Sequence, residues 1–230
     1  MSVTYALNGS VAEITIDDGK ANAYTYELLE ELGAALDRAE TEAHAVLLIG
    51  RPGRFSAGFA LPVMTESDES AQGLVAAGGR AVMRLFMFPM PVVAACTGHA
   101  LAAGGIMLLA CDRRIGADGA FKIGLNEVAI GMHLPIYAVE LARYHMPPSL
   151  FDAIVLGEVG DPQWALEHRF IDRVVAPDAL LDVARSEAQT LSALRSDAVA
   201  KTKRAARQRI ADHVAVTFDA DIATITSPIV

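Results

Sequence analysis

The residue in this chain best suited to acid–base chemistry is Glu127. It follows a Gly-Leu-Asn segment and precedes a mainly apolar run at 128–132. An apolar pocket disfavours the charged form of a carboxyl group, which moves its pKa toward the range that is useful for proton transfer. A glutamate here could instead cap the next helix or form an ion pair with Lys122. The residues alone leave these interpretations open.

Two segments could donate backbone hydrogen bonds to an anionic oxygen: the turn Gly58-Phe59 and the helix start Ala103-Gly104. The first N–H groups of a helix have no partner within it, and small residues let a ligand approach them closely. If the fold brings both segments together, two N–H groups could bind one developing oxyanion, and losing such a donor typically costs about 3 kcal/mol. Alternatively, 55–59 is an ordinary surface turn and the glycines only allow tight packing.

The remaining reactive side chains predict no second chemistry. His99 and His133 fit hydrogen-bonded structural roles as well as catalytic ones. Cys96 and Cys111 lack the spacing of a metal site, so we expect buried reduced thiols and no metal. No serine hydrolase arrangement or nucleophile elbow is present.

The bulk composition limits the partners of the protein. The chain has 230 residues and a formal net charge of −9, which disfavours nonspecific nucleic-acid binding but still allows a few local basic residues to hold a small polyanion. A hydrophobic fraction of 53% and a mean hydropathy of +0.33 indicate that some apolar surface is buried between subunits.

The uncharged stretch 91–111 is long enough to span a bilayer. A Thr-Gly-His turn and a glycine pair within it would leave backbone groups unsatisfied in lipid, so we expect buried core and no membrane partner. The first residues lack a basic segment followed by an apolar one, which predicts a cytoplasmic protein.

Recurring strand-and-helix units position these residues. Alternation around the turn Asn8-Gly9 predicts an antiparallel hairpin. Apolar runs predict buried strands, and periodic apolar faces predict helices. We expect strands at 3–7, 12–16, 45–49, 92–96, 113–117 and 171–175 and a turn at 97–98. We expect helices at 28–39, at 102–111 and over most of the chain after 135, and a polar segment at 65–72 that leads into a helix through 86.

Three motifs in order make the chain resemble the crotonase superfamily, also called the enoyl-CoA hydratase/isomerase family. They are FSAGF at 55–59, PVVAACTGHALAAGG at 91–105 and IGLNE at 123–127, within a similarity over about 3–190. The resemblance implies an α/β fold, a spiral of repeated ββα units at 1–190 with a C-terminal helical segment at 191–230 for trimerisation or closure over CoA. It also implies an acyl-CoA substrate, no further cofactor, and a homotrimer or dimer of trimers.

The resemblance assigns roles to individual residues. The N–H groups of Phe59 and Ala103 would form the oxyanion hole, and Glu127 would be the acid/base. Residues implied in substrate binding are Ala57 and Leu61 along the CoA path, Lys20, Ala21 and Arg54 by loop position, Gly104 at the helix start, and His133 in the pocket.

The departures from the family pattern indicate the reaction. Hydratases of this family use two glutamates; the first position here is Ile106, and a strict match of the loops puts the second at Leu125. Gly-Leu-Asn-Glu127 is instead similar to the motif of mitochondrial Δ3,Δ2-enoyl-CoA isomerases, which use one glutamate. The resemblance therefore favours isomerisation of 3-enoyl-CoA to 2-enoyl-CoA. A hydratase, another crotonase-type reaction and a noncatalytic acyl-CoA-binding protein remain alternatives.

Two further departures concern the helix start and the end of the chain. Ala102-Ala103 stands where the family usually has a glycine pair, and His133 stands at the dehalogenase nucleophile position, which excludes that chemistry. The segment after 197 carries a basic set, which is either a solvated face or a closure over the CoA phosphates of its own or a neighbouring subunit. The set is Lys201, Lys203, Arg204, Arg207 and Arg209.

Overall fold

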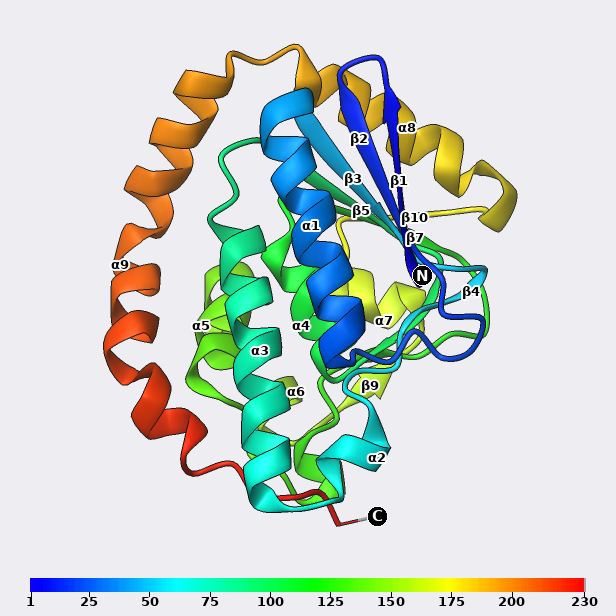
Figure 1. Ribbon diagram of the computed structural model, residues 1–230. Coiled ribbons are helices and arrows are strands. Elements are labelled where there is room, and N and C mark those ends of the chain that lie inside the picture. Colours follow the sequence, from blue (N-terminus) through cyan, green and yellow to red (C-terminus); the bar gives the residue numbers. More distant parts are fainter. Residues whose placement is uncertain (230) are drawn as a thin grey trace.

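The structure, a computed structural model, describes residues 1–229 and contains two sheets with helices around them (Figure 1). The larger sheet has the order β1 (Val3–Asn8), β2 (Val11–Ile16), β3 (Ala45–Ile49), β5 (Val92–Cys96), β7 (Arg113–Ala117) and β10 (Arg173–Val175). The smaller sheet has the order β4 (Gly53–Ser56), β6 (Gly98–Leu101), β8 (Ile123–Gly124) and β9 (Val159–Gly160). No helix within 1–229 combines the length and apolar character needed to cross a bilayer.

From β3 to β8, consecutive strands alternate between the two sheets, which confirms the predicted spiral of ββα units. β3 and β4 lead to α2 (Leu61–Met64) and α3 (Asp68–Phe86), and β5 and β6 lead to α4 (Ala103–Ala110). β7 and β8 lead to a short 3-10 turn at Val128–Ile130 and then α5 (Ile136–His145). Equivalent strands of successive units pair in parallel, so the ends of all three units meet on one side of the fold.

The smaller sheet differs from the sequence prediction. Gly98, expected in a turn, is the first residue of β6 and pairs with Gly53 of β4. Their backbones lie so close that a Cβ on Gly98 would collide with the Gly53 carbonyl. The strands of this sheet have two to four residues each, too few for an alternating pattern to identify them.

The core of the larger sheet follows the pattern expected from the sequence. The antiparallel hairpin of β1 and β2 is present, and β3 and β5 are buried throughout. One face packs against α1 (Tyr26–Glu42), α3 and α4, and the other packs against α8 (Leu180–Ser192) (Figure 1). Cys96 and Cys111 are buried free thiols in this core, as predicted.

The C-terminal helix α9 (Ser196–Ile222) runs along one flank of the molecule beside α5 and α3 (Figure 1). The chain after α9 is extended and returns to the N-terminal end of α3. The intervening chain holds α6 (Asp152–Val155), α7 (Pro162–Glu167) and 3-10 turns at Pro148–Leu150 and Pro177–Ala179. The predicted strand at 171–175 is β10, whereas β9 was not predicted.

Two of the basic residues of α9 are neither solvated nor free to bind phosphate, so both interpretations of them were wrong. Lys203 and Arg207 are buried and hydrogen-bonded to the two carboxylate oxygens of Asp112, at 2.7 Å and 2.8 Å. They lie one helical turn apart on the same face of α9. For Lys201 and the other exposed basic residues of α9, a role in closure over CoA stays a prediction. The division of the chain at residue 190 also stays a prediction.

Candidate active site

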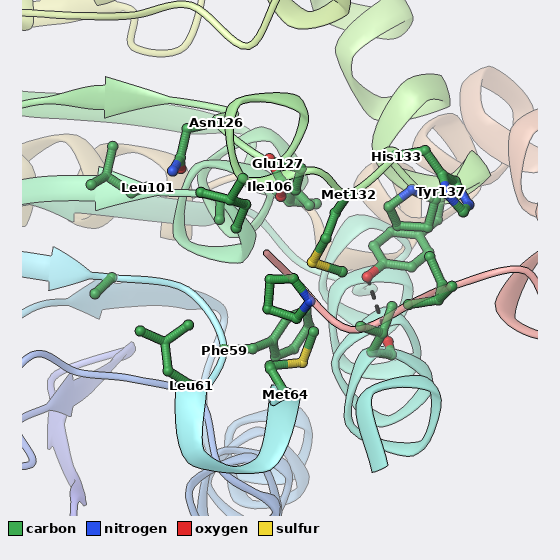
Figure 2. Close-up of a pocket in the computed structure, with 17 residues that line it drawn as sticks. Phe59, Leu61, Met64, Leu101, Ile106, Asn126, Glu127, Met132, His133 and Tyr137 are labelled. Atoms are coloured by element: carbon green, nitrogen blue, oxygen red, sulfur yellow. Dashed lines mark hydrogen bonds between the residues drawn. The ribbon is translucent and has the colours of Figure 1, made fainter. Parts of the chain in front are cut away.

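A cavity of about 180 Å³ lies where the ends of the ββα units meet (Figure 2). Its walls are mainly apolar, and the polar side chains that line it are Asn126, Glu127, His133 and Tyr137. Figure 2 shows Leu101 and Asn126 toward one end of the cavity, Glu127 near the middle, and His133 and Tyr137 toward the other end. The two ends of the cavity therefore have different side chains, and the Glu127 carboxyl group lies between them.

Glu127 is the acidic group of this cavity. It lies after β8, at the start of the 3-10 turn, and only 6% of its surface is exposed. Burial removes water from the charged form and raises the pKa of Glu127 to about 7. Within 1–229 its Oε2 atom has no hydrogen-bond partner, its side chain caps no helix, and it forms no ion pair with Lys122. The two structural interpretations of this residue were therefore wrong.

The two backbone donor segments lie against each other, as the sequence analysis required. Gly58 adopts a φ of +94°, and a Cβ built on it would lie 3.0 Å from the Ala102 Cβ and 3.4 Å from the Ala103 nitrogen. In the described part of the chain, neither the Phe59 N–H nor the Ala103 N–H donates to another group. Two unpaired donors from successive ββα units therefore adjoin the wall of the cavity.

Buried polar side chains hold the Phe59 turn in place. The Ser56 hydroxyl accepts the Gly58 N–H at 3.1 Å and donates to the Asn22 carbonyl at 2.7 Å. The fully buried Asn22 side chain donates to the carbonyls of Ile16 and Phe55. The sequence analysis missed both positioning residues. The signal for Asn22 is its place in a loop at a φ of +52°, a conformation that asparagine tolerates better than most residues.

The start of α4 packs tightly against β4 and also presents a free backbone N–H group. Ala102 has a φ of +49° and a ψ of −125°, a conformation that favours glycine, and its side chain lines the cavity. Gly104 lies outside the lining and packs against Ser56, whose carbonyl oxygen would be 2.5 Å from an added Cβ. Tight packing is thus the reason for Gly104, and it brings the free N–H of Ala103 next to the Phe59 turn.

The cavity wall includes three of the predicted binding residues. Ala57, Leu61 and His133 all line it, and the His133 Nε2 lies 3.1 Å from the Thr224 hydroxyl oxygen. Ile106 also lines the cavity and cannot carry a proton. Leu125 packs against Gly105, outside the lining, so Glu127 is the one carboxyl side chain that lines this cavity within 1–229.

The other predicted CoA contacts lie outside the cavity lining. The Ala21 carbonyl accepts the Ala57 N–H at 3.0 Å, which places the Lys20 loop beside the wall. Arg54 of β4 is in register with His99 of β6. Arg54 thus lies on β4, an edge strand of the smaller sheet, and the loop with Lys20 and Ala21 lies beside it and the cavity wall.

The sequence analysis did not group Lys122 with this basic edge. The Lys122 N–H donates to the His99 Nδ1 at 3.0 Å. Partial burial, followed by the positive charges of Arg54 and Lys122, lowers the pKa of His99 below its ordinary value. The two cations therefore disfavour the protonated form of this histidine.

A spiral of ββα units that holds one buried carboxyl group beside two unpaired backbone donors defines a crotonase-fold enzyme. The chain belongs to the enoyl-CoA hydratase/isomerase family, whose model matches residues 6–229. It is similar to a probable enoyl-CoA hydratase of Bacillus subtilis, with 34% identity over 163 residues. That match covers 68% of this chain and 62% of the relative, less than two thirds of its length.

Solved structures of the family have the same fold. A family protein from Pseudomonas syringae is 40% identical with a TM-score of 0.90, over 96% of this chain and 95% of the other. The human mitochondrial Δ3-Δ2-enoyl-CoA isomerase is 28% identical with a TM-score of 0.91, over 96% and 89% of the two chains. The fold is therefore shared by relatives that are named for different reactions.

Proposed function

We propose that this enzyme is an enoyl-CoA isomerase that converts 3-enoyl-CoA to 2-enoyl-CoA. The observation that carries the proposal is that Glu127 is the one carboxyl side chain, within the described residues 1–229, in the wall of an otherwise mainly apolar cavity. One carboxyl group can remove a proton at one carbon and return it at another. Ile106, where hydratases of the family place their first glutamate, contributes no second proton-transfer group.

The proposed reaction uses the carboxyl group and the two N–H donors. Ionised Glu127 removes a proton from C2 of the substrate, and the electron pair moves to the thioester oxygen to form a dienolate. The N–H groups of Phe59 and Ala103 donate to that oxygen, and Glu127 returns the proton at C4. A carboxyl pKa of about 7 leaves both protonation states populated near neutral pH, as a group that accepts and returns a proton requires.

Transition-state stabilisation is divided between these groups. A positioned general base typically contributes about 10²–10⁴-fold. Each backbone donor to the developing oxyanion contributes about 3 kcal/mol. Because both donors belong to the backbone and are held by packing, they need no reorganisation when the charge develops.

CoA would approach along the basic edge of the smaller sheet. Ala57 and Leu61 would line the path of pantetheine and adenine, and Gly104 would support the donor segment. Lys20, Arg54 and Lys122 would attract the CoA phosphates, and Ala21 would hold the loop against Ala57. The proposal needs no cofactor beyond the CoA of the substrate.

The assembly and location are part of the same proposal. A homotrimer or dimer of trimers in the cytoplasm would bury side chains that one chain leaves exposed, among them Val155 and Leu156. Sedimentation would measure the assembly directly. A monomer at micromolar concentration would contradict it.

The test supplies 3-enoyl-CoA and 2-enoyl-CoA of matched chain length and follows conjugation and hydration separately. We expect conjugation of the first without hydration of the second. Glu127→Gln should abolish conjugation while acyl-CoA binding is kept, and Glu158→Gln, at an exposed position, should change neither. Unchanged turnover in Glu127→Gln would rule out the assigned role, and binding without turnover in the wild type would indicate an acyl-CoA-binding protein.

A second candidate is hydration of 2-enoyl-CoA. Asn126 and Glu127 are consecutive residues that both line the cavity, and their Oδ1 and Oε2 atoms are buried and lack hydrogen-bond partners within 1–229. A water molecule that donates to both would be positioned as a nucleophile. Rapid hydration in the same assay, lost in Asn126→Ala, would favour this reaction over isomerisation.

A further inference from the structure

The segment 223–229, which we call the strap, is hydrogen-bonded to the N-terminal part of α3. The Gln72 side-chain amide donates to the Ile225 carbonyl at 3.0 Å. Ser227 donates from both its backbone N–H and its hydroxyl to the Asp68 carboxylate, at 2.7 Å and 2.9 Å. These bonds fix one side of the strap to the wall that α3 supplies.

The other side of the strap is bonded to the opposite wall. The Ile229 N–H donates to the Ile130 carbonyl at 3.0 Å, and Thr224 is hydrogen-bonded to His133. The Ile229 side chain lies so close to Gly131 that a Cβ there would be 2.9 Å away. The strap therefore connects two walls of the cavity.

Two apolar side chains of the strap form part of the cavity wall. Ile225 is 1% exposed, Pro228 is also buried, and both line the cavity. Figure 2 shows the strap, in pale red, passing the cavity near Met132 and Tyr137. The strap is thus a structural wall on the side of the cavity that includes His133.

The direction of the cavity decides which part of the substrate meets this wall. The thioester oxygen would lie at the Phe59 and Ala103 N–H groups, and Ala103 directly follows Leu101 and Ala102 of the cavity wall. Figure 2 shows Leu101 at the opposite end of the cavity from His133. An acyl chain would extend from there past Glu127 toward His133. Its terminal carbons would therefore contact Ile225 and Pro228.

We propose that the strap closes the acyl end of the cavity and limits the enzyme to short-chain acyl-CoA, with Ile225 and Pro228 as specificity-determining residues. This proposal rests on the isomerase function proposed above. A longer chain requires that the strap leave the cavity, and the strap is bonded to both walls. Short chains fit without breaking those bonds.

The test measures binding of unreactive saturated acyl-CoAs, from butanoyl through hexanoyl and octanoyl to decanoyl, by isothermal titration calorimetry. We expect wild-type affinity to fall at octanoyl and decanoyl. Ile225→Ala and Pro228→Ala should raise affinity for those two ligands on the order of tenfold, the typical effect of accommodating one further methylene group. Thr226→Ala, at an exposed position of the same strap, is the matched control and should leave the affinities for all four acyl-CoAs unchanged.

A second variant releases the strap without changing the cavity wall. Asp68→Ala removes the acceptor of both Ser227 bonds, and it should improve decanoyl-CoA binding while leaving butanoyl-CoA binding unchanged. Thermal unfolding of each variant shows that the fold is kept. Tighter wild-type binding of decanoyl-CoA than of butanoyl-CoA, with no change in the variants, would overturn the proposal.

Binding of saturated acyl-CoAs does not depend on catalysis. If no 3-enoyl-CoA is converted but the affinities change with chain length and with the variants as expected, the proposed reaction fails and the role of the strap is supported. If conversion occurs and the affinity is the same for every chain length and variant, the strap proposal fails and the reaction stands.

Discussion

Replacing Glu127 by glutamine should stabilise the protein, and the gain should increase with pH. In the wild type, burial raises the pKa of this carboxyl group from 4.5 to about 7. Below the lower value the folded and unfolded states both hold the proton. Between the two values the unfolded state releases it while the folded state keeps it, so stability falls as pH rises. Above the higher value the loss is complete.

The magnitude follows from the size of the pKa change. Since one pKa unit corresponds to about 1.4 kcal/mol, ionising the buried carboxyl group costs about 3 kcal/mol of unfolding free energy above neutral pH. Glutamine has nearly the same shape and does not titrate. The difference in stability between Glu127→Gln and the wild type should therefore grow by about 3 kcal/mol between about pH 4.5 and about pH 8.

Urea unfolding at a series of pH values measures this difference, with the fluorescence of the single tryptophan, Trp164, as the signal. Protein concentration must be constant, because assembly also contributes to apparent stability. Glu158→Gln is the exposed control and should show no pH-dependent gain. A gain in Glu127→Gln that is the same at every pH would refute the assignment of a raised pKa to this residue.

Four further outcomes are expected. The kcat/KM for isomerisation should rise with the ionised fraction of Glu127 and level off above about pH 7, as a pH–rate profile would show. Ala102→Gly should raise unfolding free energy by about 1 kcal/mol in urea titrations, because it relieves a φ of +49°. Gly78→Ala should cost about 1–3 kcal/mol and lower turnover, because the new Cβ collides with the Phe59 ring; retained turnover would show that the ring position is unimportant. Asp112→Ala should cost about 3–5 kcal/mol in unfolding experiments, because it leaves two buried cations without their carboxylate.

The sequence predicts those parts of the site that depend on local chemistry. The apolar run after Glu127 predicts its burial, and burial is what raises its pKa. Small residues at Gly58 and Ala103 mark the two donor segments. The role of Asn22 could not be predicted, because its partners lie on strands from two different units, and Ser56 bonds it from 34 positions away.

The same holds for the fold: elements with a local sequence pattern could be predicted, and contacts between residues far apart in the sequence could not. Long buried strands and amphipathic helices are visible as patterns, whereas the smaller sheet is not, because its strands are too short to show one. α9 has polar residues around its whole circumference, so no pattern indicates that Lys203 faces inward. Its partner Asp112 is 91 positions away. The strap likewise depends on pairs such as Ser227 and Asp68, which are 159 positions apart.

The unpaired N–H groups of Phe59 and Ala103 have a consequence for how this family can diversify. They belong to the main chain, so among single substitutions only a proline at position 59 or 103 deletes either of them. A descendant that has no proline there and keeps the two turns in contact inherits both. Side chains around the same cavity, such as Ile106 and His133, can change independently. A lineage can therefore try new proton-transfer groups while the anion-holding part of the site is retained with the fold itself.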